Sequence, residues 1–302
     1  MILCGEQSSL MRRVFQHPVR QKPICREVRD MQGSSITLEE YPLEEGIRIF
    51  RKAGFNSIEM WKPQLKRCKT DQLRRAFAAY ASGLGISMGG LNIIGEEYFQ
   101  PFGTDQSMER TMDGLKADAE FALSLGTRDL LIWEGVAPHG TSEGKIMSQL
   151  LPRLTELFRA VIGALKPRGI RLLVEPHPFT VGMNDRFLIE LCDSLDPAYF
   201  GVTYDFCHYG VGRPKDYITA IHALGHRIQH IHFSDTDQRI SELHFPPGSG
   251  RLNLWGMLEA FRHVGYQGSM ALDLYGYPMP VQALRAAAAR MREACEFLGL
   301  HC

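Results

Sequence analysis

The sequence predicts an α/β fold, a single closed (β/α)8 TIM barrel, and three observations lead to this class. Short β-rich runs alternate with amphipathic helical stretches about eight times from residue 34 onward. The β-rich runs are continuously apolar, which is typical of parallel strands that helices cover on the outside. Several helical stretches end in a glycine just before the next strand, as in "RKAGFNSIEMW" and "LKPRGIRLLVE".

Each repeat is expected to supply one strand and the helix that follows it. The expected strands are Ser34–Leu38, Ser57–Trp61, Ile86–Ile94, Asp129–Glu134, Ile170–Glu175, Gly201–Phe206, Ile228–Ser234 and Ser269–Leu274. The expected helices cover residues 43–53, 70–83, 106–125, 143–167, 184–195, 214–224, 254–263 and 280–298. The competing architecture is a doubly wound open sheet, but no glycine-rich phosphate loop follows the first strand.

The residues before the first repeat show no clean periodicity. We expect residues 1–33 to form an N-terminal extension and residues 34–302 to form the barrel. The extension is either an arm that packs across the barrel or onto a second subunit, or a disordered tail. The sequence therefore leaves a homo-oligomer open.

Composition and charge exclude several classes of function. The chain has 34 Lys plus Arg and 34 Asp plus Glu, so no net field favours nucleic acid or an anionic membrane. No apolar run reaches the roughly 18 residues that span a bilayer, and the N-terminal residues lack the apolar core of a secretory signal, so we expect a cytoplasmic protein. Seven cysteines without a C-x-x-C pair argue for free thiols rather than a disulfide framework or a thiolate zinc site. The expected partner is a small molecule.

Polar side chains gather where the later strands are expected to end. In a (β/α)8 barrel the chemistry lies at the C-terminal ends of the strands. His230 and His232 are two residues apart on one strand and therefore point the same way, with His232 nearer the catalytic end. The polar residues at or near the ends of the fifth to eighth strands are Glu175, His177, Asp205, His208, His230, His232 and Asp273.

Three carboxylates and one imidazole are expected to converge on the barrel axis. Buried like charges a few Å apart repel one another unless a cation lies between them. We therefore expect a divalent metal held by Glu175, Asp205, His232 and Asp273. Oxygen-rich donors favour Mn²⁺ first, with Mg²⁺, Co²⁺ or Zn²⁺ as alternatives. A single Asp or His at a strand end more often caps a helix or braces a turn. Four such residues at the ends of consecutive strands favour a metal site.

Several motifs around these residues resemble one known family. In chain order they are "GSSITLEEYPLEEGIRIFRKAGFNSIEMW", "LLVEPHP", "YDFCHYG", "HIHFSD" with "HFPPGSGRLN", and "GYQGSMALDLYG". They resemble the sugar isomerase/epimerase family of xylose isomerase-like TIM barrels, which includes ketose 3-epimerases, hydroxypyruvate isomerases and inosose dehydratases. The resemblance covers about residues 34–299. It implies that Glu175, Asp205, His232 and Asp273 bind the metal and that His208 contacts a substrate oxygen.

The residues and the resemblance together lead to a hypothesis about function. We expect a divalent-metal-dependent isomerase or epimerase of a sugar or keto-sugar, which moves a proton α to a carbonyl through a metal-stabilised enediolate. Glu175 and Asp273 are the expected catalytic residues. The side chains expected to bind the substrate are His208, His244, Arg239, Trp61, Glu134 and His177.

Three other functions are weighed against this one. The resembling family usually has glutamate where this chain has the shorter Asp273, which favours a metal-dependent lyase or dehydratase acting on a keto-sugar, an inosose or a keto-glycoside. A second alternative is a barrel that binds a sugar without turnover. The resembling family also includes abasic-site endonucleases, but this function is disfavoured. Met60, Trp61 and Asn92 stand where those endonucleases need further histidines. The chain also has no excess of positive charge to hold phosphates.

Overall fold

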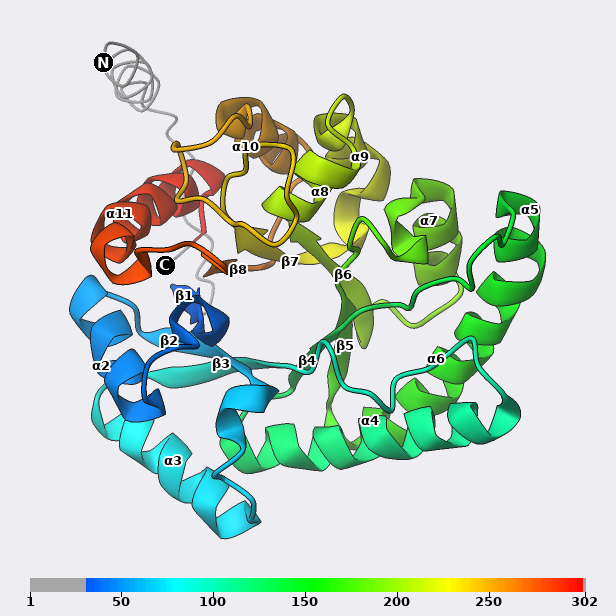
Figure 1. The fold of residues 1–302 in the computed structure, drawn as a ribbon, viewed down its shortest axis with the longest axis horizontal. Coiled ribbons are helices and arrows are strands. Elements are labelled where there is room, and N and C mark those ends of the chain that lie inside the picture. Colours follow the sequence, from blue (N-terminus) through cyan, green and yellow to red (C-terminus); the bar gives the residue numbers. More distant parts are fainter. Residues whose placement is uncertain (1–30, 301–302) are drawn as a thin grey trace.

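Eight parallel strands form a closed barrel in the order β1-β2-β3-β4-β5-β6-β7-β8, surrounded by helices (Figure 1). The structure, a computed structural model, describes residues 31–300. The predicted (β/α)8 barrel is therefore confirmed. The strands are β1 Gln32–Ser34, β2 Ser57–Trp61, β3 Ser87–Asn92, β4 Asp129–Ile132, β5 Arg171–Val174, β6 Phe200–Asp205, β7 Ile228–Phe233 and β8 Ser269–Leu272.

Helices connect the strands and cover the outside of the barrel. Among residues 31–300, none of them combines the length and the apolar composition that a bilayer crossing requires. Two are short, α5 Glu143–Lys145 and α8 Phe206–Gly212. The longer helices are α2 Leu43–Ala53, α3 Asp71–Gly83, α4 Asp105–Leu125, α6 Leu151–Leu165, α7 Asp185–Asp193, α9 Tyr217–Leu224, α10 Leu254–His263 and α11 Pro280–Leu298.

The first strand lies earlier than the sequence predicts. The expected strand Ser34–Leu38 is wrong, because β1 ends at Ser34 and Ser35–Leu38 form a 3-10 helix. The β-branched residues of this segment favour a strand, but the Ser35 hydroxyl accepts a hydrogen bond from the backbone N–H of Trp61 at 2.7 Å and turns the chain off the barrel. The expected extension falls mainly on residues 1–30, which lie outside the described part of the chain.

Two expected helices differ from the observed ones. The helix expected over 143–167 is interrupted by a π-helical segment at Ile146–Leu150, and α6 begins next to Pro152, whose missing N–H is tolerated only in a first turn. After β6 the chain enters α8 at once, because the Asp205 carboxylate accepts the backbone N–H of His208 at 2.7 Å and caps this helix. The helix expected over 214–224 begins only at Tyr217.

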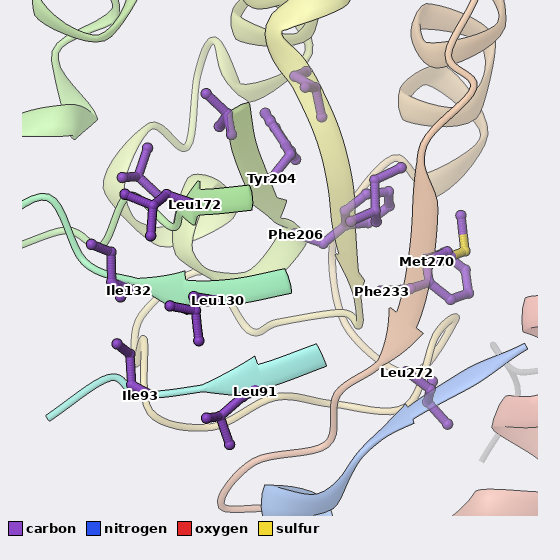
Figure 2. Packing of buried hydrophobic residues seen from close by; sticks show 14 of the residues in the cluster. Leu91, Ile93, Leu130, Ile132, Leu172, Tyr204, Phe206, Phe233, Met270 and Leu272 are labelled. Atoms are coloured by element: carbon purple, nitrogen blue, oxygen red, sulfur yellow. The ribbon is translucent and has the colours of Figure 1, made fainter. Parts of the chain in front are cut away.

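Alternation along the strands separates an apolar outer layer from a polar interior. The outward residues are buried against the helices, and Figure 2 shows them as one packed cluster that includes Leu130, Leu172 and Leu272. The alternate residues point inward. Glu59 of β2 and His230 of β7 hydrogen-bond at 3.1 Å although these strands are not neighbours, so the two side chains meet across the barrel interior.

The cysteines agree with the prediction of free thiols at three positions. Cys68, Cys192 and Cys207 are buried and free. Cys295 is disulfide-bonded, so the expectation is wrong for that residue.

Candidate functional site

Side chains from the last four strands converge at the C-terminal end of the barrel interior. His232 Nδ1 lies 2.5 Å from Glu175 Oε1, 3.6 Å from Asp205 Oδ2 and 3.7 Å from Asp273 Oδ2. All four side chains are buried. Strand register explains the convergence, because Asp205 pairs with His232 and His232 pairs with Ala271, so the inward positions of β6, β7 and β8 lie level. The structure thus brings together the four residues that the sequence predicts as metal ligands, here called the central cluster.

Three buried polar atoms at the central cluster lack a hydrogen-bond partner among the described residues. They are Asp205 Oδ2, His208 Nδ1 and His244 Nδ1. The His208 atom lies 3.8 Å from Glu175 Oε1, and the His244 atom lies 3.7 Å from Asp273 Oδ1 and 3.9 Å from Asp205 Oδ2. These separations are too long for hydrogen bonds. A cation bound among these atoms would satisfy them, so the donor set fits a divalent metal.

Burial and neighbouring charges shift the pKa values of the carboxyl groups in opposite directions. Burial raises the pKa of Glu175 to about 6; nearby His232 opposes this shift, and Asp205 and Asp273 add to it. Burial also raises the pKa of Asp273. For Asp205, His208 and His244 outweigh the effect of burial and hold its pKa well below the usual range. The carboxyl groups of one cluster therefore differ in proton affinity, which suits distinct roles.

Glu59 of β2 is part of the site, although it is not among the residues predicted from the sequence. This fully buried carboxylate accepts hydrogen bonds from Nε2 of His230 and Nε2 of His232, each at 3.1 Å. Asn92 donates to its other oxygen at 3.3 Å. Burial alone would raise the pKa of Glu59, but His232 and His230 hold it far below normal. Glu59 could have been predicted from the alternation along β2, because it shares the inward face with Ser57 and Trp61.

The two histidines of β7 occupy different depths. His230 Nδ1 lies 2.7 Å from the Ser269 hydroxyl and its Nε2 faces Glu59, so this ring is fully engaged below the central cluster. His232 turns Nε2 toward Glu59 and Nδ1 toward the three carboxylates. A carboxylate that accepts one ring N–H fixes which nitrogen is left for a metal. Glu59 therefore holds His232 in the orientation that a ligand needs.

His208 and His244 flank the central cluster, and His177 lies behind them. His177 Nε2 lies 2.8 Å from Glu242 Oε1, and its ring centroid is 4.4 Å from that of His208. Burial lowers the pKa of His208 to about 3, so this ring is neutral at ordinary pH. Glu242 therefore holds the His177 ring, which packs against the ring of His208.

The loop between β7 and α10 positions His244. The buried Asp235 carboxylate accepts four backbone N–H groups, from Thr236, Gly248, Gly250 and Leu252, at 2.8–3.1 Å. The His244 backbone N–H donates to the carbonyl of Tyr275 at 2.9 Å, and its ring Nε2 donates to the carbonyl of Ser241 at 3.1 Å. These bonds leave Nδ1 of His244 directed toward the cluster.

The remaining three predicted substrate contacts are Glu134, Arg239 and Trp61. Glu134 follows the outward residues Leu130 and Ile132 at a spacing of two, so its side chain also points out of the barrel interior. There it accepts the backbone N–H of Gly182 at 2.5 Å. Arg239 is exposed in the loop after β7. Trp61 ends β2 at the mouth, on the same face as Glu59, and is partly exposed.

The placement of Glu134 predicts a pH-dependent stability effect. Burial raises the pKa of this carboxyl from 4.5 to about 7. The unfolded chain therefore loses the proton first, and the native state loses stability as pH rises from 4.5 to 7. Glu134→Gln keeps the acceptor for Gly182 without ionising. We expect the variant to match the parent at pH 4.5 and to be more stable by on the order of 1–3 kcal/mol at pH 8.

Urea unfolding of the metal-free protein at both pH values measures this difference. Glu190→Gln, at an exposed position of α7, serves as the control and should change little. Equal stability of Glu134→Gln and the parent at pH 8 would show that Glu134 is not a buried acid.

Several proteins of known sequence are similar to this chain. Fructoselysine 3-epimerase of Escherichia coli O157:H7 is 24% identical over 84% of this chain and 93% of that protein. A putative hydroxypyruvate isomerase of Streptomyces coelicolor is 26% identical over 79% of this chain and 88% of that protein. Inosose dehydratase of Geobacillus thermodenitrificans is 22% identical over 70% of this chain and 79% of that protein. An uncharacterized protein of Methanocaldococcus jannaschii is 23% identical, but the match spans only 54% of this chain and 56% of that protein.

Solved structures share the fold. L-ribulose 3-epimerase superposes with a TM-score of 0.74 at 16% identity, covering 90% of this chain and 96% of its own. The IOLI protein, crystallised with a zinc atom, superposes with a TM-score of 0.72 at 18% identity, covering 90% of this chain and 99% of its own. The model of the xylose isomerase-like TIM barrel family matches residues 47–299, and this chain belongs to that family.

Proposed function

We propose that this protein is a divalent-metal-dependent isomerase or epimerase of a sugar or keto-sugar. The observation that carries the proposal is the central cluster, in which three buried carboxylates and His232 meet beside unpartnered atoms of His208 and His244. Relatives named as a 3-epimerase and a hydroxypyruvate isomerase, similar over most of their length, support it.

Glu175, Asp205, His232 and Asp273 are the residues that would hold the metal. Their donor set is rich in oxygen, which favours Mn²⁺, although the related IOLI structure contains zinc. A bound divalent cation supplies positive charge next to the oxygens that become negative when the neighbouring carbon loses its proton.

Glu175 is the proposed base. In the metal-free site, burial raises the pKa of this carboxyl to about 6, so it is a stronger base than an ordinary glutamate. Asp273 flanks His232 on a different strand and would return a proton, to the other face for epimerisation or to the adjacent carbon for isomerisation. Neutral His208, with Nδ1 at 3.8 Å from Glu175, would hydrogen-bond a substrate oxygen.

A lyase or dehydratase of a keto-sugar, inosose or keto-glycoside is the second candidate. Asp273 Oδ1 accepts the backbone N–H of Tyr275 at 2.9 Å, which limits the reach of an already short side chain. A group that cannot reach the second carbon returns the proton poorly, and expulsion of a β-substituent then competes. The relative named inosose dehydratase supports this candidate.

Replacing the proposed base gives the most direct test of the reaction. We expect Glu175→Gln to lower deuterium incorporation from D₂O into substrate by at least about 100-fold, because general base catalysis is lost. The assay uses the Mn²⁺-loaded protein with ketoses, inososes and 3-keto-glycosides, and NMR detects the label.

Exposed Glu190→Gln is the matched control and should exchange at the parent rate. Exchange by Glu175→Gln at that rate would show that Glu175 is not the base. Release of a group in place of deuterium incorporation by the parent protein would favour the lyase.

Metal affinity should fall in acid. The metal competes with protons on Glu175, whose pKa is about 6, and on His232, whose pKa is raised because Glu59 and Glu175 outweigh burial. We expect the affinity for Mn²⁺ to fall at least about tenfold per pH unit below pH 6. Titration calorimetry in buffers of different ionisation enthalpy measures both the affinity and the protons released. An affinity that stays constant from pH 7 to 5 would contradict this ligand set.

Glu59 should contribute to metal affinity although it is not an expected ligand. Glu59→Gln removes the negative charge behind His232, and we expect the Mn²⁺ affinity to fall about 10- to 100-fold. Competition with a chelator measures the change. Asp118→Asn is the control, because Asp118 is a buried carboxylate that pairs with Lys62 and Tyr98 away from the cluster. Unchanged affinity in Glu59→Gln would show that Glu59 has no role in orienting His232.

A further inference from the structure

A cavity of about 410 Å³ lies between the loop after β3 and the loop after β4. The proposed reaction uses residues at the ends of β5 to β8 and leaves this cavity without a role. Its polar lining side chains are Glu96, which is paired with Lys62 at 3.0 Å, and the exposed Glu97 and Gln100. Most of the lining is apolar or aromatic, and it includes Ile94, Tyr98, Phe99, Phe102, Trp133 and Val136.

Trp133 connects the cavity to the central cluster. Its ring lines the cavity and lies 4.7 Å from the ring centroid of His177. The His177 ring lies 4.4 Å from that of His208, and His208 Nδ1 lies 3.8 Å from Glu175 Oε1. The indole N–H of Trp133 has no partner among the described residues and is available to a ligand oxygen. Trp133 therefore lies between the cavity and the packed rings of His177 and His208, which adjoin Glu175.

The chemistry of the cavity does not suit a free sugar. Nearly every carbon of a sugar carries a hydroxyl, and each buried hydroxyl needs a hydrogen-bond partner. The cavity offers few such partners, and its volume falls in the range of about 300–1,000 Å³ that is typical of sites for larger organic ligands. Its largely apolar lining suits an apolar ring.

Apolar side chains also surround the mouth of the barrel. Of the large hydrophobic residues that are exposed in the described chain, Val136, Phe179, Ile240 and Met279 follow β4, β5, β7 and β8, and only Leu73 lies on an outer helix. Val136 also lines the cavity. Isolated exposed hydrophobic residues need no explanation, but their concentration at one end of the barrel marks a surface that binds apolar groups.

We propose that this cavity binds an apolar, ring-sized substituent, such as an aryl group, carried by the keto-sugar whose reactive carbon lies at Glu175. The substrate class is then a keto-glycoside with an apolar aglycone rather than a free ketose. This inference rests on the proposed function, because it takes the sugar to bind at the central cluster.

A matched pair of ligands tests the inference on the full-length, Mn²⁺-loaded protein. Titration calorimetry compares methyl and phenyl 3-keto-β-D-glucopyranoside, which differ only in the aglycone. We expect the phenyl glycoside to bind at least tenfold more tightly. Val136→Asp places a charge at the cavity and should reduce this preference to less than threefold, while Val136→Ser should reduce it to an intermediate value.

Leu73→Asp is the control. Leu73 is 48% exposed, close to the 54% of Val136, but it lies on the outer helix α3 and not at the cavity. Leu73→Asp should keep the full preference. Equal affinities of the parent for the two glycosides, or a preference that survives Val136→Asp, would overturn the cavity inference and leave the proposed function standing. If the metal-loaded protein binds neither glycoside, the proposed function fails for this sugar class and the inference fails with it.

Discussion

The catalytic end of the barrel depends on His232, because both nitrogens of its ring are held by carboxylates. Nε2 lies 3.1 Å from Glu59, and Nδ1 lies 2.5 Å from Glu175. Burial would lower the pKa of this imidazole, but the two carboxylates raise it well above its ordinary value. One positive ring therefore offsets part of the charge of two buried carboxylates, and a metal would have to displace the proton on Nδ1 to bind there. The interior can bury this many carboxylates only because such compensation is built in.

Much of the fold and part of the site could be predicted from the sequence. Continuous apolar strands, each followed by an amphipathic helix, identify the barrel, and the barrel in turn identifies strand ends as the place for chemistry. This local information suffices to bring Glu175, Asp205, His232 and Asp273 together. Their convergence requires only that each residue occupy an inward position at the end of its strand.

Other features depend on contacts that the sequence does not display. Glu59 acts through His230 and His232, which follow it by more than 170 residues and lie on a strand that is not its neighbour. Glu134 was misplaced because one position along a strand reverses the direction of a side chain. The cavity near Trp133 is formed by two loops, and loop shape is set by tertiary packing rather than by local pattern.

The four hydrogen bonds of Asp235 have a consequence for how this enzyme family can diversify. They fasten both ends of the loop after β7, near Thr236 and near Gly248 to Leu252, independently of the residues between. Exposed positions such as Arg239 and Ile240 can therefore change without moving the loop ends. Evolution, or an engineer, can alter what such a barrel accepts at its entrance while the reacting groups beneath keep their geometry.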